Sequence, residues 1–145
     1  MDRGLSFDLH ALTARLDRAA DRILQAESGL SFRRFMALLA VAELGTATQR
    51  ALAEKLGVSE PSVSRMTGLL AAAGLLDAEA DPVGGNRRQL SLTPSGRDVV
   101  EQSRVLLERR FTGLVERSGV PYGDYAQHTR RLMAALDESE RETRR

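Results

Sequence analysis

The sequence has no cysteine and no tryptophan, and it has only two tyrosines and four phenylalanines among its 145 residues. Without cysteine the chain forms no disulfide, no thiolate metal site and no cysteine nucleophile, so thiol redox sensing is excluded. So few aromatic rings leave little material for binding a large flat ligand. An ordinary globular core is still expected, because 42% of the residues are hydrophobic.

Long apolar runs and a strong net charge are also missing. The first ten residues carry charges and no apolar segment of secretory length, and the longest apolar run, near residues 36–42, is too short to span a bilayer. We therefore expect a cytoplasmic protein with no membrane partner. The net charge of +1 is low for a nucleic-acid binder, because phosphate neutralisation dominates affinity for a duplex. Such a function would need cations concentrated locally.

Residues 48–66, TQRALAEKLGVSEPSVSRM, predict two short helices joined by a tight turn. Gly57 suits a left-handed residue at the end of the first helix. Ser59 suits the cap of the second, and Pro61 is tolerated in its first turn. These features together predict a helix-turn-helix. Its apolar stripes contain Leu52, Ala53 and Leu56 on the first helix and Val63, Met66 and Leu70 on the second.

Further helices and a hairpin surround this motif. Apolar periodicity predicts a long amphipathic helix before Gly29, and a buried helix that Ser31 caps. Two short alternating segments flank the segment DPVGGNRR, whose aspartate, proline, glycines and asparagine favour a turn. Thr93 caps another long helix that begins with Pro94. The predicted helices cover about 7–24, 32–44, 94–117 and 122–140. The first predicted strand begins at Leu75 and Leu76, and Leu76, Ala78 and Ala80 alternate with acidic residues along it. The second covers 89–93, with Leu90 and Leu92 facing inward.

The predicted fold is mainly α with a small two-stranded β-wing, which is a winged helix-turn-helix with flanking dimerisation helices. The helices outside the winged helix exceed what that small lobe needs, so a second copy of the chain is the simplest partner for them. We expect residues 1–30 to form a dimerisation helix, 31–97 the DNA-binding lobe and 98–145 the C-terminal dimerisation helices. All three segments belong to one intertwined domain.

Three segments of the chain resemble the MarR family of bacterial transcriptional regulators. LSFRRFMALLAVAELG is similar to the second helix of the family, TQRALAEKLGVSEPSVSRMTGLLAAAGLL to its helix-turn-helix, and QLSLTPSGRDVV to its wing strand and following helix. The resemblance implies a triangular homodimer whose two lobes bind a palindromic operator on double-stranded DNA. In many members it also implies a small-molecule effector bound between the dimerisation helices and the lobe.

Candidate DNA contacts follow from the residue types on the second helix of the motif. Arg65 lies outside the buried stripe, where a guanidinium can bind guanine O6 and N7 or a phosphate. The serines supply short hydrogen-bonding groups, and the amides that open the first helix suit a phosphate. The candidates in the helix-turn-helix are Thr48, Gln49, Arg50, Ser59, Pro61, Ser62, Ser64 and Arg65.

The wing supplies three more candidates, Asn86, Arg87 and Arg88. Arginines on a glycine-rich hairpin have no core role, so we expect at least one to enter a minor groove or bind its phosphates. The wing of the family often carries Asp-x-Arg, whereas GGNRR stands here with Asn86 at the arginine position. Which of the two arginines contacts DNA therefore stays open.

An effector pocket is implied only by the resemblance, and residues of the candidate types are more often plain core than ligand contacts. The lobe is close to neutral, and Leu69 lies on the second helix of the motif, so a winged helix that binds proteins is the alternative function. No catalytic arrangement, metal site or cofactor is expected. Asp8 is at a poor helical spacing from His10, and although Asp124 lies four residues before His128, a histidine on a helix surface is the better account of both. The candidate pocket residues are Leu12, Phe32, Phe35, Met36 and Leu39.

Overall fold

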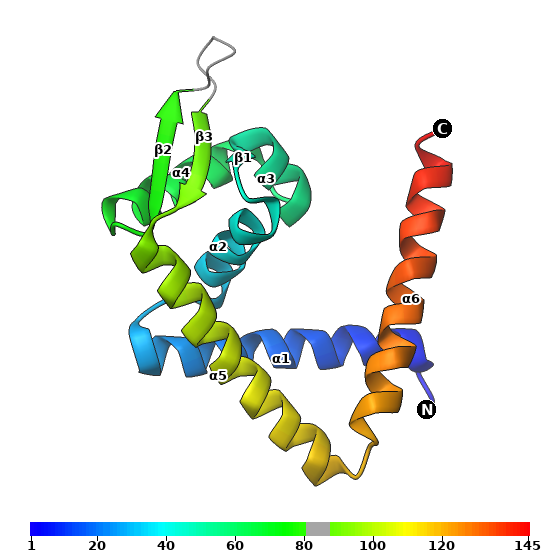
Figure 1. The fold of residues 1–145 in the computed structure, drawn as a ribbon. Helices are drawn as coiled ribbons and strands as arrows, with labels where there is room; N and C mark the ends of the chain where they lie inside the picture. The colour runs from blue at the N-terminus through cyan, green and yellow to red at the C-terminus, as the bar shows by residue number, and fades with distance from the viewer. Residues whose placement is uncertain (81–87) are drawn as a thin grey trace. The chain divides into compact units, whose positions relative to one another are not determined.

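The computed structural model describes residues 1–80 and 88–145, and Figure 1 shows its six helices and three strands. Contacts divide the chain into two compact units, Met1–Val105 and Leu106–Arg145, and each is described by itself. None of the described helices combines the length and apolar character that crossing a bilayer requires. The elements are α1 (Leu5–Ser28), α2 (Phe32–Leu44), β1 (Ala47–Thr48), α3 (Gln49–Leu56), α4 (Glu60–Ala72), β2 (Leu76–Ala80), β3 (Arg88–Leu92), α5 (Pro94–Ser118) and α6 (Tyr122–Thr143).

Helix α2 is the centre of the first unit. It packs against α1, α3, α4 and β3, and the side chains of Ala37, Leu38 and Val41 are fully buried. Its start is held by the Ser31 hydroxyl, which accepts a hydrogen bond from the Arg34 N–H at 3.2 Å. The prediction of a buried helix over 32–44 is therefore confirmed, because caps and apolar content act together there.

The sheet has three antiparallel strands in the order β1-β3-β2. The predicted hairpin is confirmed, with Leu76 opposite Leu92 and Ala78 opposite Leu90. Strand β1 was not predicted, and it places Thr48 opposite Gln89. Two residues are too few to show an alternating pattern in the sequence.

The inward alternation expected along the first strand of the hairpin is only partly correct. Leu76 is buried, Ala78 is half-buried and Ala80 is exposed. Beyond Ala78 the hairpin extends past the core, so the inward-facing positions lose their cover. On β3, by contrast, Leu90 and Leu92 are both buried as expected.

A tightly bonded joint connects the start of β2 to the start of α5. The Thr93 N–H donates to the Leu75 carbonyl at 3.2 Å, and the Thr93 hydroxyl donates to the Gly74 carbonyl at 2.6 Å. The same hydroxyl accepts from the Gly96 N–H at 3.0 Å, which confirms Thr93 as the cap of α5. Gly96 is buried, and a Cβ built on it would lie 2.1 Å from the Leu75 carbonyl oxygen.

The second unit consists of the end of α5 and helix α6. The Tyr122 hydroxyl donates a hydrogen bond to the Glu108 carboxylate, and this contact raises the pKa of Tyr122 above its ordinary value. Val115 is buried, whereas Leu132, Met133 and Leu136 on α6 are 57–61% exposed. An apolar stripe of this size on one helix needs cover from another surface.

Candidate nucleic-acid interface

The turn between α3 and α4 has the geometry that the sequence predicts. Gly57 has a left-handed backbone with φ of 67°, and its N–H group bonds to carbonyls of α3. The Val58 N–H donates to the Ala53 carbonyl at 3.1 Å, and the Val58 side chain is half-buried beside the turn. This arrangement fixes the direction in which α4 leaves α3.

One face of α4 packs into the core. Val63, Thr67 and Leu70 are buried, and Met66 is half-buried. Sequence reasoning missed Thr67 because its side chain is polar. The structure buries it by letting its hydroxyl donate to the Val63 carbonyl at 2.8 Å, the i−4 bond that satisfies a threonine inside a helix.

The opposite face of α4 is open to solvent. Pro61, Ser64 and Arg65 are exposed there, together with Gly68 and Leu69, while Ser62 is half-buried at the edge. Pro61, Arg65 and Gly68 follow the i, i+4, i+7 spacing of one helical stripe. The structure therefore brings the predicted candidates of the second helix onto one surface.

Polar contacts connect three candidate residues, Ser59, Ser62 and Arg65, at the start of α4. The Ser59 hydroxyl accepts from the Ser62 N–H at 3.3 Å, which confirms the predicted cap, and it donates to the Ser62 hydroxyl at 3.0 Å. The Arg65 guanidinium lies 3.5 Å from the Ser62 hydroxyl. That distance is at the outer limit of a hydrogen bond, so Arg65 is held only weakly and can turn toward a ligand.

At the start of α3, the Thr48 hydroxyl accepts from the Ala51 N–H at 3.1 Å and caps the helix. Gln49 is half-buried, and Arg50 is exposed. The Arg50 Nε atom lies 3.6 Å from a carboxylate oxygen of Glu54, one turn along the helix. The i, i+4 spacing of these two residues is visible in the sequence, but sequence reasoning did not use it.

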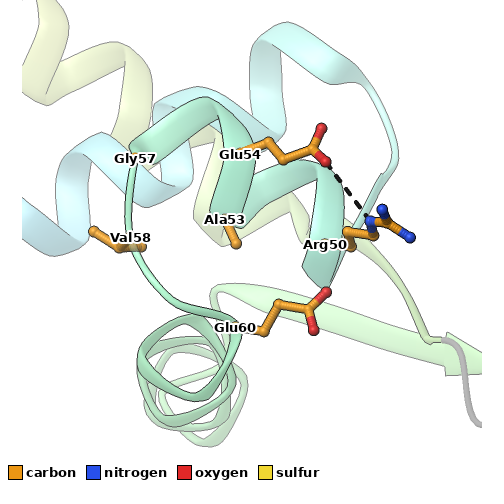
Figure 2. Close-up of a pocket in the computed structure, with 6 residues that line it drawn as sticks. All are labelled: Arg50, Ala53, Glu54, Gly57, Val58 and Glu60. Carbon is orange, nitrogen blue, oxygen red and sulfur yellow. Dashed lines mark ion pairs between the residues drawn. The ribbon is translucent and has the colours of Figure 1, made fainter.

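An open hollow of about 520 Å³ lies between α3 and the start of α4, and Figure 2 shows its lining. The Arg50–Glu54 ion pair lies on one side, and the Glu60 carboxylate points toward the Arg50 end of α3. The hollow thus has two carboxylates for one guanidinium. Its lining residues are Arg50, Ala53, Glu54, Gly57, Val58 and Glu60.

Of the predicted wing residues, only Arg88 belongs to the described part of the chain. It is the first residue of β3, is exposed, and stands opposite Ala80 on β2. Asn86 and Arg87 lie outside the described residues.

The cations of residues 48–97 differ in whether an acid neutralises them. The Lys55 ammonium lies 2.9 Å from the Glu43 carboxylate, and Arg50 has Glu54. Within residues 1–80 and 88–145, by contrast, Arg65, Arg88 and Arg97 form no ion pair with a carboxylate. These three exposed guanidinium groups are available to an anionic ligand.

The predicted effector residues have different surroundings. Phe35 is buried, and its ring centroid lies 6.2 Å from that of the half-buried Phe32. Leu39 is half-buried, whereas Leu12 and Met36 are exposed. The role of these residues in binding a ligand stays a prediction.

The described part of the chain contains no group of three or more His, Cys, Asp or Glu side chains that could hold a metal ion. Neither His10 nor His128 makes a hydrogen bond or ion pair with another described residue.

Comparison with known proteins gives matches to one group of regulators. A model described as MarR family matches residues 28–86. An HTH-type transcriptional regulator from Mycobacterium leprae is 34% identical over 116 residues, which cover 80% of this chain and 78% of the relative.

Solved structures show the same fold at low sequence identity. A cysteine-to-serine mutant of MarR from E. coli matches with a TM-score of 0.80 and 19% identity, covering 94% of this chain and 98% of that one. The same mutant in complex with operator DNA matches with a TM-score of 0.75 and 19% identity, covering 91% of this chain and 93% of that one.

Proposed function

The chain belongs to the MarR family of HTH-type transcriptional regulators, and we propose that it is a homodimeric, ligand-responsive repressor that binds a palindromic operator. One observation carries this proposal. The exposed face of α4 presents Arg65 without a carboxylate partner in the described part of the chain, between serines that can donate and accept hydrogen bonds. A helix with such a face can enter the major groove and bind base edges.

A two-fold dimer supports the palindromic part of the proposal. Two recognition helices that bind one face of a duplex need half-sites about 34 to 36 Å apart. The exposed leucines and methionine of α6, Leu132, Met133 and Leu136, would be covered by a second copy of the chain. We expect the purified protein to sediment at twice the 15.9 kDa chain mass at micromolar concentration. Sedimentation at the chain mass alone would count against the dimer.

Such a dimer would also allow a ligand to release it from the operator. A small change in the distance between two recognition helices removes one of the two sets of base contacts, and this lowers affinity for the operator. The candidate ligand contacts are those named from the resemblance, Leu12, Phe32, Phe35, Met36 and Leu39. With so few aromatic residues in the chain, a small phenolic or carboxylate compound suits them better than a large flat one.

Selection of bound fragments from random-sequence DNA tests the proposal directly. We expect the protein to enrich a palindrome, and mobility shift should show tighter binding to that palindrome than to random DNA. The DNA flanking its own gene is the first place to search for the site. If nothing is enriched, the alternative function, a protein-interaction module, gains support from Leu69, which is 55% exposed on α4.

The modest number of free cations leads to an expected salt dependence. Within residues 48–97 of each copy, Arg65, Arg88 and Arg97, with Arg87 as a fourth cation, would neutralise about six to eight phosphates per dimer, so the log–log slope of affinity against salt should be about −5 to −7. A titration of operator binding against potassium chloride measures it. A slope of about −10, as found for strongly basic repressors, would contradict the expectation.

A further inference from the structure

The hollow between α3 and α4 holds two carboxylates beside a candidate phosphate contact. Glu54 is paired with Arg50 at 3.6 Å, and Glu60 lines the same hollow from the first turn of α4. Figure 2 shows both carboxylates on the side of the hollow where Arg50 lies. A surface built only to attract DNA would not place two negative charges here.

The Arg50–Glu54 pair adds little to the stability of the fold. Both side chains are highly exposed, at 77% and 73%, and exposed ion pairs contribute little in water. Glu54 also follows Arg50 in the chain, which is the less favourable order for such a pair in a helix. It stands near the C-terminal end of α3, where the helix dipole disfavours an acid. The stability of α3 therefore does not explain why residue 54 is a glutamate.

Glu60 has a different position. It is the first residue of α4, where a carboxylate is favourable for the helix. It is exposed and forms no ion pair with any other described residue. The N-terminal end of a recognition helix is the end that approaches the bases, so the Glu60 carboxylate lies at the end of α4 that would face DNA.

We propose that Glu54 and Glu60 are specificity-determining residues, which weaken binding to DNA that lacks the operator sequence. This inference rests on the proposed function. Nonspecific binding depends on phosphate contacts alone, and a lobe without base contacts adopts whichever orientation gains most of them. Glu54 withholds Arg50 from these contacts, and Glu60 repels phosphates at the rim of the hollow. On the operator, base contacts fix the lobe in one position, so the carboxylates cost less there.

The test compares wild-type protein with the double variant Glu54→Gln, Glu60→Gln. We expect binding to random DNA to tighten about 5- to 10-fold, since one more phosphate contact is gained in each lobe. The salt slope for random DNA should steepen by about 1 to 2 for the same reason. Operator affinity should rise less than about threefold. Fluorescence anisotropy on the selected palindrome and on a scrambled fragment measures all of these quantities.

Glu101→Gln is the matched control. It removes one negative charge and breaks another exposed pair, that between the Glu101 carboxylate and Arg104 at 2.8 Å on α5. Arg104 holds the pKa of Glu101 below its ordinary value, so the carboxylate that this variant removes is charged at neutral pH. If the single variant Glu54→Gln, which also removes one charge and breaks one exposed pair, gains no more random-DNA affinity than this control, or if the double variant gains equally on both fragments, the inference is overturned.

Folding and function are separated by two further measurements. Thermal unfolding reports whether loss of the Glu60 charge destabilises α4. The single variant Glu54→Gln leaves Glu60 in place, so its binding to operator and random DNA can be compared without a change in α4. The proposed function fails if wild-type protein binds operator and random DNA equally. The inference then fails with it, because there is no preference for the operator that Glu54 and Glu60 could increase. If wild-type protein prefers the operator and the variants leave random-DNA binding unchanged, the inference alone fails.

Discussion

Replacing Arg65 by alanine is expected to abolish sequence-specific retention of DNA. Arg65 is exposed on α4, and among the described residues its side chain contacts only the Ser62 hydroxyl, at 3.5 Å, so little holds it away from a base. A bidentate arginine–guanine contact contributes about 1 to 3 kcal/mol of discrimination. Because the proposed dimer carries two copies, the operator preference should fall by about 2 to 6 kcal/mol, twice that amount. Competition between operator and random fragments in a mobility shift measures the loss.

Two variants separate base recognition from charge in this experiment. Arg65→Lys keeps the cation but loses the planar pair of donors, so it should bind random DNA normally and still lose most of the preference. Arg97→Ala removes the same charge from an exposed site on α5 and should weaken binding to all sequences alike. If Arg65→Ala behaves like Arg97→Ala, then Arg65 contacts phosphate and a different residue recognises the base.

The second large effect concerns folding. Gly96→Ala is expected to destabilise the first unit by about 3 kcal/mol or more, at the upper end of what overpacking costs. The added Cβ would lie 2.1 Å from the Leu75 carbonyl oxygen. That oxygen accepts from the Thr93 N–H at 3.2 Å, so it cannot move without breaking the joint between β2 and α5. Urea unfolding followed by circular dichroism measures the change.

Gly68→Ala is the control for this prediction. Gly68 also lies inside a helix, but a Cβ at that position meets nothing within 4 Å. Alanine should therefore stabilise α4 by about 0.5 to 1 kcal/mol, because it is the better helix former. Opposite signs for the two substitutions would show that the close approach at Gly96, and not helix propensity, decides its effect. Equal stability of Gly96→Ala and wild-type protein would refute the account.

The helices could be predicted from the sequence because short-range signals define them. Ser31, Ser59 and Thr93 cap the helices that follow them, and each has the predicted hydrogen bond to the backbone. Gly57 has the left-handed backbone that the turn requires. In each case one side chain and its immediate neighbours decide the conformation, so pattern and structure agree.

Features that depend on distant parts of the chain could not be predicted in this way. Strand β1 exists because β3 lies beside it, and Gly96 is buried because Leu75 lies against it. Lys55 is neutralised by Glu43, which comes from another helix. None of these contacts produces a periodic pattern or a motif in the sequence.

The sequence indicates which face of α4 is exposed, but it does not indicate the contacts that the candidate residues make with one another. The exposed face of α4 is the one that the helical period of Val63 and Leu70 indicates. The hydroxyls of Ser59 and Ser62, however, also bond to each other, and Arg50 has an acid partner. Contacts of these residues with DNA stay predictions that the binding experiments above can test.

The two-residue strand β1 has a mechanical consequence for DNA binding. Thr48 is both the residue paired with Gln89 on β3 and the cap of α3. Arg88 precedes Gln89 in β3, so the start of α3 and this cation are linked through backbone hydrogen bonds of the sheet. The distance between them should therefore change little when the protein binds. If both groups bind phosphates of one duplex, as proposed, the DNA must match that distance, and affinity should then depend on the width of the groove between them.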